Sequence, residues 1–486
     1  MLLSAGLAGC SPDQGAAAAT PQRAKPLPNI VVYLVDTLRA DALGVDGAAA
    51  DVSPGIDAFA SEAAVFDNAL SQAPWTLPST TSFQTSSYPV SSRILHDGDK
   101  VGAQAETLVE YMQSLGYHTV GFISNPVGGS LAGLDQGFDE FTEHWLPKKP
   151  APGEPAPQGD PLQPLFDWAA GEHGDEPQFL YVHTLEPHDP YDGAMHEPAG
   201  RFVGTPEERE HLRVWMNVQR GLGVRQFNGK LSPDEATRLQ YATTHLVGRE
   251  HDIRDLYDGD VRQASDNFER LIGLLRSKPG WKDTVVVFLS DHGEEFHEHG
   301  SWFHGHSAYQ ELLHVPLILR VPGLTDAGMH VSEPVQLIDV LPTLAELVGG
   351  PVSPDWQGRS LVPLLRGVRD APPRPVFAMR VVTEQSLRGE RGLTETALID
   401  GTWKLIVHHD VGRASLFDLA HDPAEQHDLS AEQPERAQAM LRAVEERLQQ
   451  LPVLPLRSTE TPDAAAQAMR REQLENLGYV ERARPR

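Results

Sequence analysis

Three uninterrupted apolar segments, each followed directly by polar residues, constrain the fold of this chain more than any other feature. They are residues 30–35 (IVVYLV), 179–182 (FLYV) and 285–290 (VVVFLS). Apolar runs without alternation are typical of strands that are buried on both faces, as in parallel sheets covered by helices. With 486 residues, the chain is long enough for one large domain with a smaller one beside it. The sequence therefore predicts an α/β fold.

Polar side chains that suit metal binding follow each of these segments. Asp36 follows the first, His183 and His188 follow the second, and Asp291 with His292 follows the third. In open α/β sheets, ligands bind at the carboxyl ends of strands, so we expect these side chains to lie close together. Carboxylates and imidazoles form a mixed oxygen and nitrogen site for one or two divalent cations, such as Ca, Mn or Zn. A single aspartate at a strand end usually only caps a helix, but three such strand ends favour a site.

A proline-rich stretch at residues 73–83 (APWTLPSTTSF) holds the hydroxyl of Thr76 between Pro74 and Pro78. Each proline fixes its own φ and restricts the preceding residue, so the loop is stiff. It leads into a predicted helix, whose N-terminal N–H groups favour an anion. The alternative is an ordinary proline turn. Beside a metal, however, the hydroxyl would have a lowered pKa and could attack an anionic ester, while neighbouring histidines protonate the leaving group.

The rest of the chain is expected to surround this site. We predict further strands at residues 120–124 and 315–321, and helices starting at Pro54 and at residues 106–115, 234–277 and 339–348. Residues 147–164 are predicted to form an exposed, proline-rich loop, and residues 195–231 an insertion or lid without steady periodicity. From residue 374, short alternating runs and a helix at 434–448 predict a small α+β subdomain.

The N-terminus is expected to be an export signal. Cys10, the one cysteine of the chain, lies in the sequence LAGCS, which resembles the lipobox of bacterial lipoproteins. We therefore expect lipidation of Cys10, export to the cell envelope, and a flexible tether up to residue 28. The alternative is an incidental cysteine in a disordered tail. No later run of about 18 apolar residues predicts a membrane span, so contact with a membrane is expected only through the lipid.

The net charge of −28 disfavours nucleic acids and anionic membrane surfaces as partners, because like charges repel. An anionic substrate must then be attracted locally, by a metal or by some of the 21 histidines. The expected substrate is a small-molecule, glycan-linked or lipid-linked anionic ester.

The chain resembles the sulfatases of the alkaline phosphatase superfamily in residues 29–41, 74–85, 183–191, 290–300 and 309–322. The resemblance implies a large domain (29–373) with a mixed, mostly parallel sheet, and a C-terminal subdomain (374–486) with an antiparallel sheet. It also implies site residues: Asp36, Asp291, His292 and Thr76 at a divalent metal, Thr76 as the nucleophile, His188 and His306 on the substrate anion or leaving group, and His183, His304, Asn125 and Arg39 near the substrate.

Three departures from the family pattern change the expected chemistry. Sulfatases carry a formylglycine, made from Cys or Ser in Cys-x-Pro-Ser-Arg, where this chain has Thr76, and Thr80 replaces the arginine. The family's Gly-Lys-x-His motif is replaced near Asn125, and the second acid of its paired Asp is Thr37. Threonine is the nucleophile of the superfamily's phosphodiesterases and phosphoethanolamine transferases. The hypotheses are therefore a hydrolase of sulfate or phosphate esters, a phosphodiesterase or transferase that uses phosphothreonine, and a surface binding protein without activity.

Overall fold

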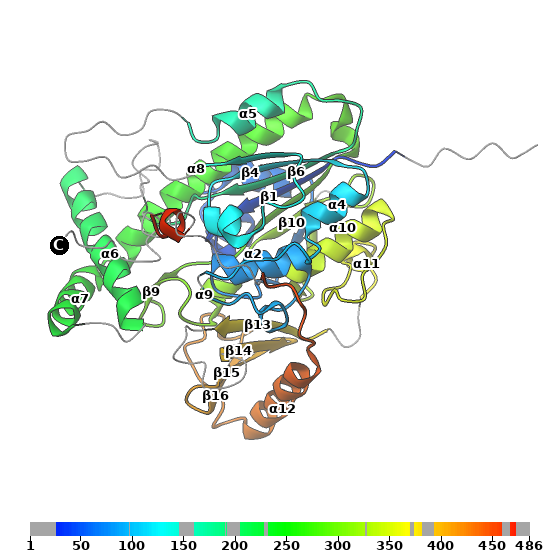
Figure 1. Ribbon diagram of the computed structural model, residues 1–486. Helices are drawn as coiled ribbons and strands as arrows, with labels where there is room; N and C mark the ends of the chain where they lie inside the picture. Colours follow the sequence, from blue (N-terminus) through cyan, green and yellow to red (C-terminus); the bar gives the residue numbers. More distant parts are fainter. Residues whose placement is uncertain are drawn as a thin grey trace, which may run out of the picture.

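A mixed eight-stranded sheet forms the centre of the molecule, with helices on both faces (Figure 1). The computed structural model describes residues 26–96, 98–144, 160–189, 191, 205–227, 232–325, 328–369, 374–381, 393–458 and 467–472. In spatial order the strands are β11 (Met329–Val331), β2 (Ala64–Phe66), β10 (Leu317–Arg320), β7 (Val285–Ser290), β1 (Ile30–Val35), β6 (Gln178–Thr184), β4 (His118–Ile123) and β5 (Glu140–Glu143). β10 pairs antiparallel with β7 and β2, and the other pairs are parallel, which confirms the predicted sheet.

The two faces of β1 pack into separate hydrophobic cores because successive side chains of a strand point in opposite directions. Val31, Tyr33 and Val35 pack into the core that contains α1 (Pro54–Ala60), α5 (Gln163–Ala170) and α8 (Glu250–Arg276). The alternate side chains of β1 pack into the core that contains α2 (Thr76–Thr85), α4 (Leu108–Ser114), α10 (Val340–Val348) and α11 (Val362–Leu365). Burial on both faces explains why the strand segments of the sequence are uninterrupted and apolar.

A separate antiparallel sheet follows the large domain, as predicted. Its strands lie in the order β13 (Val376–Val381), β14 (Leu393–Asp400), β15 (Trp403–His408) and β16 (Arg413–Asp418), and α12 (Pro434–Gln450) packs on it (Figure 1). A fully buried ion pair joins Lys404 Nζ to Glu425 Oε1 at 2.8 Å. Lys404 also donates to Gln310 of the large domain, which ties the two parts together. The short elements are α3 (Pro89–Ser92), α9 (Gln310–Leu313), β3 (Ala69–Leu70), β8 (Glu295–Phe296), β9 (Trp302–Phe303) and β12 (Val335–Gln336).

After α12 the chain returns to the large domain. The backbone N–H of Leu454 donates to Ser91 O, and that of Ser458 donates to Lys100 O. Between them, Leu456 packs on the hydrophobic cluster around Leu77, in the first turn of α2. The last part of the chain therefore supports the helix that carries Thr76.

The region between β6 and α8 differs from its prediction. Residues 206–227 form the long helix α6 (Pro206–Phe227), which pairs with α7 (Pro233–Leu246) as a hairpin beside the sheet (Figure 1). Sequence analysis missed this helix because its sequence is mostly polar. Few of its apolar side chains pack into the core, and Leu212 and Met216 are two that do. The predicted helix at 234–277 is two helices, separated at Gly248, whose φ of +86° ends the first one.

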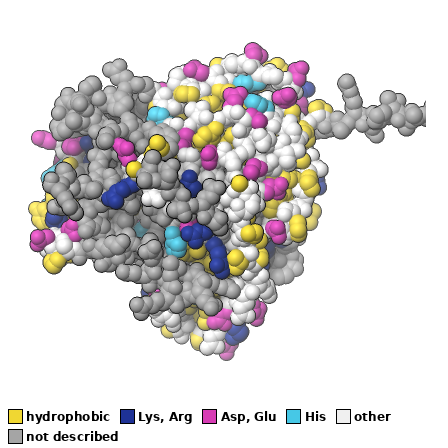
Figure 2. Space-filling view, in the orientation of Figure 1, with side chains coloured by type: hydrophobic (Ala, Val, Ile, Leu, Met, Phe, Trp, Pro, Cys, Tyr) yellow, Lys and Arg dark blue, Asp and Glu magenta, His cyan; other side chains and the backbone are white. Residues whose placement is uncertain are grey.

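Several predicted features lie outside the described residues. These are Cys10, most of the tether and most of the loop at 147–164. In the described part of the chain, no helix has the length and apolar character needed to cross a membrane. Figure 2 shows Asp and Glu side chains spread over the visible face, in keeping with the acidic composition.

Candidate active site

The N-terminus of α2 presents Thr76 to the carboxyl end of the sheet. Thr76 is the first residue of the helix and is fully buried, and Pro78 lies in the same turn. Its Oγ1 lies 3.2 Å from Nε2 of His292, which follows β7. The first turn of a helix carries partial positive charge, so this hydroxyl occupies a place that favours an anionic group.

Asp36, directly after β1, lies at the centre of the site. Its Oδ2 accepts hydrogen bonds from Asn125 Nδ2 at 2.5 Å and from the ring of His183 at 3.2 Å. Its Oδ1 is buried and has no hydrogen-bond partner among the residues that the structure describes. A buried carboxylate oxygen without a partner is costly, unless a cation is bound there.

Asp291 and His292 complete the cluster from β7. Asp291 Oδ1 accepts from the backbone N–H groups of Thr37 and His292, whereas its Oδ2 is buried without a partner. His292 donates through Nδ1 to the carbonyl of Gly293, which leaves the lone pair on Nε2. That Nε2 lies 3.6 Å from Asp36 Oδ1 and 3.5 Å from Asp291 Oδ2.

These donors fit a divalent cation. Asp36, His183 and Asp291 are buried and offer ligand atoms that all lie within 4.8 Å of one another. The two unpaired carboxylate oxygens and the unprotonated Nε2 of His292 face one another, and this is the hard, mixed donor set that Ca, Mn or Zn accept.

The pKa values of the two carboxyl groups, Asp36 and Asp291, are shifted in opposite directions. Burial alone would raise the pKa of Asp36, but the hydrogen bond from His183 and the surrounding imidazoles lower it to about 2. Burial and the negative charge of Asp36 raise the pKa of Asp291. The two groups therefore cannot both ionise without repulsion, which a cation between them would remove.

Gly128 allows the close approach of the chain to this cluster. It lies in the turn after β4, and a Cβ atom placed on it would come within 2.4 Å of Cε1 of His183 and 3.5 Å of Cγ2 of Thr76. The distance to Thr76 is an ordinary contact, but the distance to His183 is too short, so any larger residue would displace the imidazole of His183.

A second group of histidines borders the first. The rings of His188 and His304 are 5.0 Å apart, and those of His304 and His292 are 4.6 Å apart. His188 donates through Nδ1 to the carbonyl of Asp189. The carboxylate of Asp189 forms an ion pair with Arg220 of α6 at 2.5 Å.

Two acidic residues after Gly293 bind the remaining histidines. His304 Nδ1 lies 3.0 Å from Glu294 Oε1, and His306 Nε2 lies 2.6 Å from Glu295 Oε2. Burial, with added contributions from the surrounding cations, lowers the pKa of His304. Burial and the negative charge of Asp189 raise the pKa of Glu294. His304 is therefore neutral at neutral pH.

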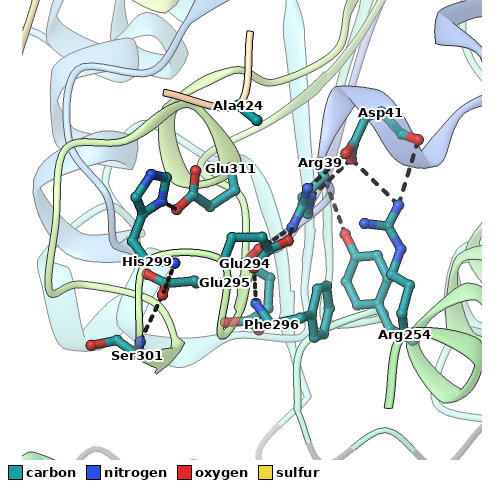
Figure 3. Close-up of polar contacts among 12 residues, drawn as sticks. Arg39, Asp41, Arg254, Glu294, Glu295, Phe296, His299, Ser301, Glu311 and Ala424 are labelled. Atoms are coloured by element: carbon teal, nitrogen blue, oxygen red, sulfur yellow. Dashed lines mark hydrogen bonds and ion pairs between the residues drawn. The ribbon is translucent and has the colours of Figure 1, made fainter. Parts of the chain in front are cut away.

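Arg39 lies beside the site, and each of its three guanidinium nitrogens makes a hydrogen bond within the protein. Its Nε and Nη2 bind the carboxylate of Asp41, and its Nη1 donates to Glu298 and to the carbonyl of Glu294. Figure 3 shows this guanidinium held between Asp41 and the loop that carries Glu294. We therefore leave Arg39 out of the substrate site proposed below.

The structure brings most of the predicted residues to one place. Direct contacts link Asp36, Asn125, His183, Thr76 and His292. Asp291 borders Asp36, His188 and His304 line the adjoining side, and His306 is held by Glu295. Sequence reasoning missed Asp189, Glu294 and Arg220. The first two lie within motifs that were recognised, whereas Arg220 lies in the insertion, where no signal could have identified it.

Comparison with known proteins identifies the family. The family model for sulfatases matches residues 28–350, and the model for the C-terminal region of N-sulphoglucosamine sulphohydrolase matches residues 297–453. This chain belongs to the sulfatase family. The sulfatase assignment makes it an ester hydrolase.

Two relatives of known name and one solved structure are similar to this chain. The choline-sulfatase of Rhizobium meliloti is 26% identical over 465 residues, which cover 84% of this chain and 83% of the relative. The Delta 4,5-hexuronate-2-O-sulfatase of Bacteroides thetaiotaomicron is 25% identical over 457 residues, 87% of each chain. The crystal structure of the phosphonate monoester hydrolase of Agrobacterium radiobacter superposes with a TM-score of 0.64 at 20% identity, over 90% of this chain and 100% of that one.

Proposed function

We propose that this sulfatase-family protein is a metal-dependent ester hydrolase in which Thr76 is the nucleophile, and that it prefers phosphoric esters to sulfate esters. The position of Thr76 supports this most directly: its hydroxyl lies at a helix N-terminus, 3.2 Å from Nε2 of His292. Threonine cannot be converted to formylglycine, so sulfate cannot be released by elimination from an aldehyde hydrate. A covalent phosphothreonine that water hydrolyses remains available.

Asp36, Asp291 and His292 would hold the cation, with Thr76 beside them. The ion would supply Lewis acidity, which lowers the pKa of a neighbouring hydroxyl and offsets the charge of an anionic ester. The protein keeps these groups dry and preoriented: Asn125 fixes the Asp36 carboxylate, and the Gly293 carbonyl fixes the tautomer of His292.

The proposed reaction has two steps. Thr76 releases its proton to solvent, its Oγ1 bonds to phosphorus, and the bond from phosphorus to the leaving alcohol breaks. His188 is our candidate for the group that protonates the leaving oxygen, because burial keeps the neighbouring His304 neutral. Water then attacks the phosphothreonine, and the Thr76 hydroxyl is restored.

The test compares wild type with Thr76→Ala and Thr76→Ser on an aryl phosphodiester, an aryl phosphonate monoester and an aryl sulfate. Thr76→Ala should lose turnover by about 10³-fold or more while keeping its far-UV circular dichroism and its metal content. Thr76→Ser should retain measurable activity. Mass spectrometry of the wild-type enzyme, acid-quenched during turnover, should show on Thr76 the mass of the substrate without its leaving alcohol. If Thr76→Ala turns over normally, Thr76 is not the nucleophile.

Hydrolysis of sulfate esters is the second candidate, because the relatives named above include a choline-sulfatase and a hexuronate sulfatase. These names also support a glycan-linked or other small anionic ester as the substrate class. The aryl sulfate arm of the panel decides between the candidates. A metal-loaded protein that turns over none of the three esters would favour the alternative of a binding protein.

We also propose that the chain is exported and anchored through lipidated Cys10, which lies in a lipobox-like sequence. Labelling of the expressed protein with an alkyne-bearing fatty acid should depend on Cys10. Equal labelling of a Cys10→Ser variant would contradict the proposal.

A further inference from the structure

Arg220 carries a buried positive charge from the α6–α7 hairpin to the edge of the site. Its side chain is 11% exposed, and its Nη1 lies 2.5 Å from Asp189 Oδ2. Its Nη2 is buried as well, and none of the described residues offers it a hydrogen-bond acceptor. A buried, charged N–H group without an acceptor costs free energy. The unused donor is therefore suited to an acceptor that a ligand brings.

Arg39 is the other arginine beside the site, and it differs in this respect. Its Nε and both of its terminal nitrogens make hydrogen bonds within the protein, to Asp41, Glu298 and the Glu294 carbonyl. Arg220 keeps one terminal nitrogen available while Asp189 fixes the rest of its guanidinium. An arginine held in this way presents its remaining N–H groups in a defined direction.

The contacts place Arg220 on the side of the leaving group. Asp189, its partner, follows His188. The ring of His188 lies beside that of His304, which lies beside His292, and His292 contacts Thr76.

We propose that Arg220 is a specificity-determining residue, whose free Nη2 binds an anionic group on the alcohol part of the substrate. The proposal rests on the function proposed above, in which His188 protonates that alcohol. It assigns to the substrate a second negative charge, such as a carboxylate or a further ester anion, beyond the ester that is cleaved. The α6–α7 hairpin then sets substrate choice without taking part in bond cleavage.

The test uses two phosphodiesters that differ only in their leaving groups, phenol and 3-hydroxybenzoate. Arg220→Gln should lower kcat/KM for the carboxylate-bearing ester by about 10- to 100-fold, mainly through KM, as expected for loss of one charged hydrogen bond. The phenyl ester should change less than 3-fold. Arg220→Lys should recover part of the loss. Arg213→Gln removes an arginine paired with Glu210 on the same helix and is the matched control. Equal losses on both esters, or no loss on either, would overturn the proposal.

A binding measurement separates this inference from the proposed function. Titration calorimetry of 3-hydroxybenzoate and of phenol needs no turnover. Wild type should bind the carboxylate at least 10-fold more tightly than Arg220→Gln does, and equal binding would refute the inference even if the enzyme is active. Because Arg220→Gln removes the arginine partner of the buried Asp189 carboxylate, the double variant Arg220→Gln/Asp189→Asn is measured too. The double variant should show the same loss of 3-hydroxybenzoate affinity as Arg220→Gln, with the thermal stability of wild type.

Discussion

Replacing Asp291 by Asn should have opposite effects on the stability of the metal-free and the metal-loaded protein. Asp36 and Asp291 are both fully buried, and their ligand atoms lie within 4.8 Å of each other. Two negative charges at that distance repel by about 3.5 kcal/mol at an effective dielectric constant of about 20. Asn keeps the shape and the Oδ1 acceptor that the N–H groups of Thr37 and His292 use. It removes the charge and places an NH2 group where the buried Oδ2 stood.

Without metal, Asp291→Asn should therefore be more stable than wild type, by about 3 kcal/mol at most. With about 2.1 cal/mol/K of unfolding entropy per residue, this corresponds to a rise in Tm of about 3 °C for the whole chain. With metal, the variant should be less stable than wild type, because it has lost a ligand whose binding free energy stabilises the folded state.

The assay is thermal unfolding of both proteins in EDTA and in excess Ca, Mn and Zn. The pH dependence has a defined sign. The pKa of Asp291 is raised in the fold, so the cost of ionising it accumulates as pH rises from about 4, the pKa of Asp in an unfolded chain, up to the folded pKa. The advantage of Asn in EDTA should grow over the same interval and stay constant above it. A variant that is less stable than wild type in EDTA at pH 8 would show that no such repulsion exists.

Three further predictions concern the surroundings of the site. Gly128→Ala should lower metal affinity by about 10-fold or more, measured by competition with a chelator, because the added Cβ displaces His183; unchanged affinity would mean that the turn relaxes. His299→Gln should destabilise the protein in urea more at pH 6 than at pH 9. Burial alone would lower the pKa of His299, but the hydrogen bond to Glu311 at 2.6 Å raises it. The stability that His299 contributes is therefore full below about pH 6.5 and is lost as pH rises through the folded pKa. An equal loss of stability at pH 6 and pH 9 would contradict this. Lys404→Met should lower the free energy of unfolding by about 3 kcal/mol, because it leaves the charge of Glu425 buried without its partner. Lys404→Met/Glu425→Gln should recover much of this loss, and urea unfolding that shows no loss in the single variant would contradict the prediction.

The sequence predicted the parts of the site that depend on the sheet. Asp36, His183 and Asp291 each stand at the end of a buried apolar strand, and neighbouring parallel strands must bring such ends together. The antiparallel strand β10 does not disturb this, because it lies on the far side of β7 from β1.

The parts that could not be predicted depend on contacts between distant, polar segments. Arg220 reaches Asp189 from a helix whose sequence shows no clear apolar stripe, so neither the helix nor the pairing had a signal. Arg39 was expected near the substrate from the resemblance to sulfatases. Its guanidinium instead binds Asp41, two residues further along, a local pairing that sequence position alone cannot exclude.

The return of the chain after α12 has a consequence for biosynthesis. Leu456 and the backbone around Ser458 complete the packing around the first turn of α2, although about 380 residues separate these segments in the sequence. A ribosome must therefore translate about 380 residues beyond Leu77 before the packing behind Thr76 is complete. Until Leu456 has been translated, the emerging polypeptide carries Thr76 on a helix that lacks part of its support.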